Sequence, residues 1–288
     1  MAEVFPIRRP ALDLSGLTAR LGSEAATSTG RSPRHWHAEG PFATHFFDAL
    51  SSTFPFGEAY FVRSVVAYRD RIEDPELLAR IRAFAGQEGQ HSRIHDEHVD
   101  LLLADGYRLL AFRNRFIDRI LRFQNRHVPK LALAITAALE HLTAILARVL
   151  LADGARRTAA MDPVMAPIWR WHALEEAEHK AVAFDVLCRV APSRSLRVAA
   201  MAIASFFLVF ETTLRTTYML AKDGLLFDGP TWSRGLGFLF GAEGFLRGSG
   251  SAYRAWYRRD FHPDETDDSA MIARIAPQVM REIADAQA

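Results

Sequence analysis

The sequence has little of what disulfide bonding, nucleic-acid binding or secretion would require. Cys188 is its one cysteine, so no disulfide can form within the chain and a reducing, cytoplasmic location is expected. A total of 35 Lys and Arg against 34 Asp and Glu leaves a net charge of +1, and we therefore expect no nucleic-acid partner. The N-terminal residues lack the basic and then apolar order of a secretion signal.

Long hydrophobic runs and strand signals are also scarce. The most apolar stretch, residues 198–210, is shorter than the roughly 20 residues that a membrane span needs, so no transmembrane span is expected. It could still contact a membrane surface, line an apolar tunnel or form a homodimer contact. Alternating Val, Ile and Thr runs between hairpin turns are almost absent, which predicts an all-α protein.

The chain divides into an arm and one helical domain. Residues 1–40 are rich in Pro, Ser, Arg and Gly with weak periodicity, and we expect an N-terminal arm lying over the rest. Residues 41–288 are predicted to form a single domain, with a metal-binding bundle at 55–192 and additional C-terminal helices at 193–288.

Prolines mark where four of the helices are expected to start. The predicted first turns contain Pro55, Pro75, Pro129 and Pro163. Proline suits a first turn because the N–H that it lacks would have no helical partner there. Asp74 and Asp162 stand where they can cap two of these helices.

One face of the helix expected from Pro75 changes from apolar to polar in its middle. At helical spacing this face carries Leu77, Ile81, Phe84, Glu88, His91, His95, His98 and Leu102. Glu88 and His91 form a Glu-x-x-His motif, whose two side chains project to the same side. Burial of an unpaired carboxylate is strongly unfavourable, so such a face needs partners.

The same motif recurs, and two isolated glutamates complete a pattern. Glu176 and His179 form a second Glu-x-x-His in the last of the four helices, while Glu58 and Glu140 are lone acids in apolar helices. This order of ligands is typical of ferritin-like four-helix bundles with a carboxylate-bridged pair of iron or manganese ions. We therefore predict two metal ions, iron with manganese or zinc as alternatives. The predicted ligands are Glu58, Glu88, His91, Glu140, Glu176 and His179.

The residue before each motif is expected to hold the opposite histidine. A metal-bound imidazole normally donates its other N–H to a carboxylate or carbonyl oxygen. Glu175 should accept from His91, and Gln87 should accept from His179.

The chain resembles a bacterial family of predicted metal-dependent hydrolases over roughly residues 40–270. The resemblance lies in residues 47–58, 87–95, 171–185 and 261–264. Its recurring blocks, Gln-Glu-x-x-His-x-x-x-His and His-x-x-Glu-Glu-x-Glu-His, include His95 and His172. The resemblance implies that both histidines belong to the metal site, either as additional ligands or as hydrogen-bonding neighbours of the ligands.

Three functions fit this ligand set. The first is an oxidase or oxygenase that uses O₂ and an electron donor to act on a small apolar substrate, and we take this as the main expectation. The alternative is a two-metal hydrolase, as the resemblance implies, in which paired ions activate water. A third is ferroxidase activity in iron handling.

Overall fold

The computed structural model describes residues 5–10, 14, 34–152 and 155–285. This part of the chain contains helices and no strand, which confirms the all-α prediction. In chain order the α-helices are α2 (Pro41–Ser51), α3 (Phe54–Val66), α4 (Pro75–Ala104), α5 (Leu109–His127), α6 (Pro129–Ala152), α7 (Ala155–Ala159), α8 (Met165–His179), α9 (Val182–Val190), α10 (Arg194–Lys222), α11 (Gly229–Phe240), α12 (Ser249–Ala255) and α13 (Ser269–Asp285).

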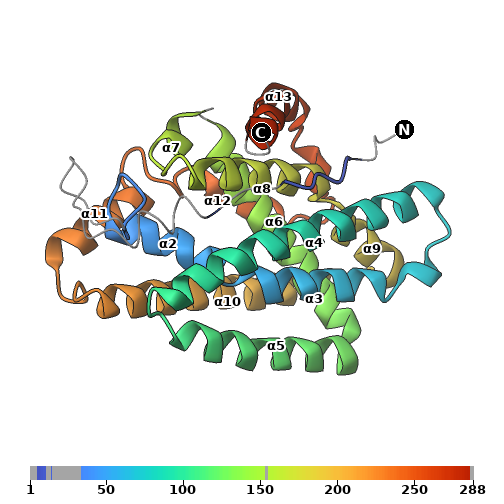
Figure 1. Cartoon of the computed structure of the whole chain (residues 1–288). Coiled ribbons are helices and arrows are strands. Elements are labelled where there is room, and N and C mark those ends of the chain that lie inside the picture. Colours follow the sequence, from blue (N-terminus) through green and yellow to red (C-terminus); the bar gives the residue numbers. More distant parts are fainter. Residues whose placement is uncertain (1–4, 11–13, 15–33, 153–154, 286–288) are drawn as a thin grey trace.

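Four of these helices pack together and carry the predicted ligands. α3 packs on α4 and α6 packs on α8, while α3 also contacts α6 and α4 contacts α8. Their shared interior is where the ligand-bearing faces meet. α10 covers α6 and α2, and α5 lies on the outside against α3 and α6 (Figure 1). The ferritin-like topology itself stays a prediction.

Three of the four proline-marked starts are found where the sequence predicts them. α3 has Pro55 in its first turn, and α4 and α6 begin at Pro75 and Pro129. The carboxylate of Asp74 accepts the backbone N–H groups at the start of α4, as an N-cap should. These local signals therefore fix where the long bundle helices begin.

The fourth helix starts later than predicted and ends before the predicted bundle does. α8 begins at Met165, after a turn in which Asp162 accepts the N–H of Val164. It ends at His179, and a new helix, α9, starts only at Val182. Within the break, Lys180 Nζ donates to Asp268 Oδ2 at 2.7 Å. The last part of the predicted 55–192 bundle is thus interrupted directly after a metal-ligand position.

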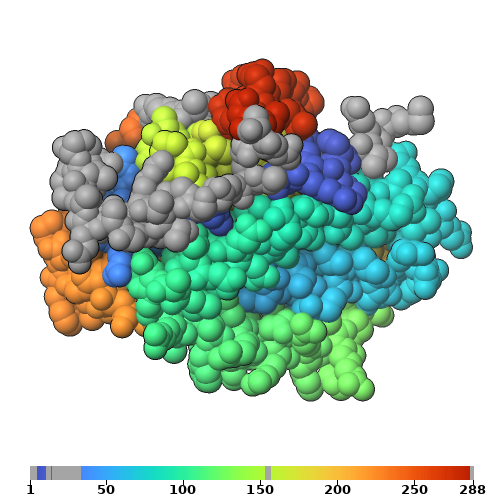
Figure 2. Space-filling model, in the orientation of Figure 1, coloured from blue at the N-terminus to red at the C-terminus, as the bar shows by residue number. Residues whose placement is uncertain are grey.

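Residues 5–10 of the N-terminal arm lie against the bundle. Arg8 bonds Glu175 and Glu178 of α8, and the carbonyl of Pro10 accepts from Arg93 of α4. Figure 2 shows this segment in dark blue between α4 and α13. Most of the predicted arm lies outside the described residues.

Two of the described helices, α6 and α10, are long and apolar enough to cross a membrane by length and composition alone. α6 is mostly buried and carries Glu140 in the interior, as a core helix would. α10 extends well beyond the apolar run at 198–210, and only about a third of its most apolar window is buried.

Candidate metal centre

The structure brings the six predicted metal ligands together in the interior. They come from four helices: Glu58 from α3, Glu88 and His91 from α4, Glu140 from α6, and Glu176 and His179 from α8. Every one of these side chains is buried. Glu58 and Glu140 are lone acids outside the Glu-x-x-His motifs, so the sequence evidence for them as ligands was the weakest. They are 1% and 0% exposed.

Overlapping groups of ligand atoms show how two ions could share the site. Four sets of atoms each lie within 4.8 Å of one another: Glu58, Glu88 and His91; Glu88, Glu176 and His179; His91, His172 and Glu176; and Glu58, His95 and His172. Glu140 joins them, because its Oε2 lies 3.4 Å from His179 Nε2. Glu88 and Glu176 each share one set with His91 and another with His179, so these two carboxylates lie between the two motif histidines.

The donor atoms face a common space and are not satisfied by one another. His179 Nε2 lies 3.0 Å from Glu88 Oε1, yet the geometry is not that of a hydrogen bond. Buried polar atoms almost always have a partner. Among the described residues, the atoms without one include Glu58 Oε1, both carboxylate oxygens of Glu88 and Glu140, His91 Nδ1, His172 Nε2 and His179 Nε2. Such a set fits cations that would bind all of these atoms together.

The charges of the buried carboxylates also favour bound cations. Burial, with the nearby Glu88 and Glu176 carboxylates, raises the pKa of Glu58 well above its usual value. Burial and Glu88 likewise raise the pKa of Glu140. Burial opposes a charged His179, but the carboxylates of Glu140, Glu176 and Glu88 raise its pKa well above normal. Two divalent cations would balance four buried carboxylates and remove this mutual repulsion.

Both expected hydrogen bonds between ligand histidines and opposite helices are present. His91 Nε2 lies 3.1 Å from Glu175 Oε2, and His179 Nδ1 lies 2.9 Å from Gln87 Oε1. Each bond uses one ring nitrogen and leaves the other, His91 Nδ1 or His179 Nε2, directed into the cluster. This is the orientation that such hydrogen-bond acceptors give to metal-binding imidazoles.

The structure gives His95 and His172 different roles, which the sequence could not distinguish. His95 Nδ1 bonds Ser51 Oγ at 2.8 Å, and its Nε2 bonds His172 Nδ1 at 2.8 Å, so both nitrogens of His95 are engaged. The Nε2 atom of His172 is directed at the cluster and lies 3.2 Å from Glu176 Oε1. His172 is thus placed as a seventh donor, and His95 is placed to hold it.

Three residues around the site carried no recognisable sequence signal. Arg8 Nη1 lies 3.1 Å from Glu175 Oε1, so the arm supports the carboxylate that holds His91. Ser92 donates to Glu58 Oε2 at 3.0 Å, and Thr143 donates to Glu176. Ser92 and Thr143 each lie close in sequence to a ligand, but their direction depends on helix packing.

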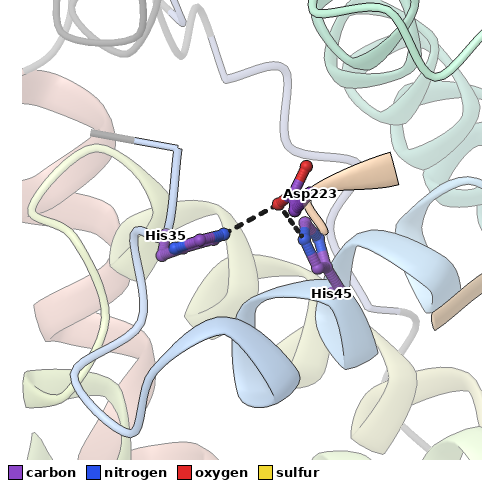
Figure 3. Close-up of side chains that lie close together, drawn as sticks. All are labelled: His35, His45 and Asp223. Carbon is purple, nitrogen blue, oxygen red and sulfur yellow. Dashed lines mark hydrogen bonds and ion pairs between the residues drawn. The ribbon is translucent and has the colours of Figure 1, made fainter. Parts of the chain in front are cut away.

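A second cluster of possible ligands is formed by His35, His45 and Asp223 (Figure 3). His35 Nε2 and His45 Nε2 each lie 2.8 Å from Asp223 Oδ2. The other His45 nitrogen bonds Asp48 at 3.1 Å. Burial opposes protonation, but the two carboxylates raise the pKa of His45 to about 9. Both nitrogens of His45 are engaged by carboxylates, so this cluster is explained by its own ion pairs.

The chain belongs to the family described as predicted metal-dependent hydrolases, whose family model matches residues 24–267. No curated protein and no solved structure matches the chain. Metal dependence agrees with the ligand clusters found here. The oxidase or oxygenase expectation, with its O₂ and electron donor, is wrong by this finding, and the hydrolase alternative is the better supported. The ligand set misled because the same carboxylates and imidazoles serve both chemistries.

Proposed function

From that family membership we propose that this chain is a two-metal hydrolase acting on a small-molecule substrate. The observation that carries the proposal is the convergence of buried donor atoms without hydrogen-bond partners at the meeting point of α3, α4, α6 and α8. Paired ions, when bound, activate water and polarise an ester or phosphate group.

The roles of the residues follow from their positions. Glu88 and Glu176 would help to hold both ions, because each shares one donor set with His91 and another with His179. Glu58 and Glu140 would bind at opposite ends, one near His91 and the other near His179. Four carboxylates and neutral imidazoles balance two divalent charges.

His172 would supply a third imidazole. Its Nδ1 is engaged with His95, so its Nε2 is the nitrogen directed at Glu176. The hydrogen bond between His95 Nδ1 and Ser51 Oγ keeps the ring of His95 in place, and His95 in turn fixes His172. Orientation of this kind matters because a ligand displaced by a fraction of an ångström binds more weakly.

Iron stays the predicted metal. Two glutamates and two Glu-x-x-His motifs on four helices are the ligand set of di-iron and di-manganese bundles. Zinc also accepts carboxylate and imidazole ligands, so metal analysis must decide between them.

The test combines metal analysis with a hydrolysis assay. Protein stripped with chelator is reloaded with Fe²⁺, Mn²⁺ or Zn²⁺ and assayed on p-nitrophenyl esters and phosphates. We expect about two ions per chain and hydrolysis with at least one metal. Glu88→Ala should lose both, whereas Glu97→Ala, at an exposed position of the same helix, should keep both. Two bound ions without hydrolysis of either substrate class would overturn the hydrolase proposal, and a single ion would overturn the two-metal site.

A further inference from the structure

A large apolar cavity lies beside α10. Its volume is about 520 Å³, within the range of small-molecule pockets. Side chains of α2, α6, α10, α11 and α12 form its wall, among them Phe46, Ile145, Leu208, Trp232 and Tyr253. The surface of that wall is overwhelmingly hydrocarbon.

Three of the seven hydroxyl groups in the wall are hydrogen-bonded within the protein. Two others, Thr212 Oγ1 and Ser249 Oγ, are buried without a partner among the described residues, but polar atoms form only a small part of the wall surface. Ser205 Oγ lies 3.1 Å from the Tyr253 hydroxyl, and Thr216 donates to the backbone carbonyl of His45. The cavity therefore favours a ligand that is itself mainly hydrocarbon.

The cavity opens to the surface through α10 and α11. Val209 and Phe240 both line it, and they are 66% and 64% exposed. Leu208 lines the cavity from the same helix, while Phe206, 70% exposed, points away to solvent and is not part of the wall. The apolar run of α10 thus forms one side of an entrance.

A second, small hollow lies between this cavity and the metal centre. Its volume is about 30 Å³, enough for a water molecule, and His172 and Glu176 form part of its wall. Leu50 and Leu146 line both hollows, so they stand between the cavity and the metal centre. A rotamer change of these two side chains would join the hollows into one path.

We propose that this cavity binds the straight hydrocarbon chain of an ester substrate. With Leu50 and Leu146 in the changed rotamers, the chain would extend past them, which places the ester carbonyl at the enlarged hollow beside His172 and Glu176. Water then adds to the carbonyl carbon, the bond from that carbon to the alcohol oxygen breaks, one proton of the water passes to that oxygen, and a long-chain acid and an alcohol leave. This inference rests on the proposed hydrolase function and names its substrate class.

The first test is chain-length dependence in the metal-loaded protein. Burial of one methylene group is worth a factor of about four in binding, so lengthening the acyl chain from butyrate to octanoate should raise kcat/KM by roughly two hundredfold. p-Nitrophenyl esters of acetic, butyric and octanoic acid measure this directly. Acetate and octanoate esters hydrolysed with equal kcat/KM would overturn the inference.

The second test fills the cavity. Leu208→Trp should lower the ratio of octanoate to acetate kcat/KM by at least tenfold, while Leu214→Trp, on the same helix but outside the wall, should keep the wild-type ratio. Thr213→Phe provides a wall position that is exposed and so tolerates a larger side chain if Leu208→Trp fails to fold. Equal ratios in all folded variants would contradict the inference.

Binding without catalysis separates this inference from the proposed function. cis-Parinaric acid, a fluorescent long-chain acid, should bind the metal-free protein and bind Leu208→Trp more weakly. Chain binding without hydrolysis of either esters or phosphates would support the cavity and refute the hydrolase. Metal-dependent hydrolysis of short esters, without chain binding or chain-length preference, would refute the cavity and support the hydrolase.

Discussion

Replacement of Glu175 tests whether the metal centre depends on its surrounding hydrogen bonds. Glu175 is fully buried, with Oε2 lying 3.1 Å from His91 Nε2 and Oε1 lying 3.1 Å from Arg8 Nη1. Glu175→Ala would leave the His91 N–H without its acceptor. Arg8 would still be held, because two of its nitrogens bond Glu178 at 2.7 Å. The damage should therefore concentrate on the orientation of His91.

The expected loss is about 10–100-fold in metal affinity, the usual effect of removing such a partner. This corresponds to roughly 1.4–2.8 kcal/mol. Titration of the stripped protein with Zn²⁺ against a competing chelator measures it, and circular dichroism checks that helical content is kept. Glu175→Gln keeps a carbonyl oxygen that can accept from His91, so its affinity should fall between those of wild type and Glu175→Ala.

The result that would refute this reasoning is specific. Equal affinity in wild type and Glu175→Ala, with helical content intact, would mean that Glu175 does not orient His91 for binding. Equal losses in Glu175→Ala and Glu175→Gln would mean that the negative charge matters and the hydrogen bond does not.

Three further predictions concern stability. Despite burial, the pKa of His45 in the folded protein is about 9, against an ordinary 6.5, because of its pairing with Asp48 and Asp223. The pairing therefore stabilises the fold fully below about pH 6.5, and this stabilisation is lost as the pH rises through 9. Urea denaturation should show a fall of about 3 kcal/mol in the free energy of unfolding over this range, and His45→Gln should show no such loss. Glu140→Leu should raise the melting temperature of the stripped protein, since it removes a buried carboxylate without a partner, and should also reduce metal content. Lys180→Met should cost about 1–3 kcal/mol, because it removes the bonds from Nζ to Thr266 and Asp268; unchanged urea denaturation would contradict this.

Local sequence signals were enough for three of the four helix starts and for the ligand-bearing faces. Proline in the first turn and the Asp74 cap act within a few residues, so they can be read without knowing the fold. The face from Leu77 to Leu102 is buried throughout, as its spacing predicts. Burial of Glu58 and Glu140 followed from their being lone acids in apolar helices.

Features that depend on distant contacts could not be read in this way. The break after His179 is accompanied by contacts of Lys180 with Thr266 and Asp268, which lie 86 and 88 residues away. Arg8 reaches Glu175 from a segment with no periodicity. Nothing near these residues in the sequence indicates which partner they meet.

The reaction was harder to predict than the site, and the reason is chemical. Carboxylates and imidazoles fix the ions and their charge balance, but they leave open which bond the ions act on. What selects a substrate lies beyond the ligands, in the side chains that shape the approach to them. Here that approach is a hydrocarbon-walled cavity, separated from His172 and Glu176 by Leu50 and Leu146. Leu50 comes from α2 and Leu146 from α6, and no periodic pattern in either helix marks its residue as different from other core leucines. The ligands can therefore be predicted from their spacing in the sequence, whereas the substrate path cannot, because that path is defined by packing between helices.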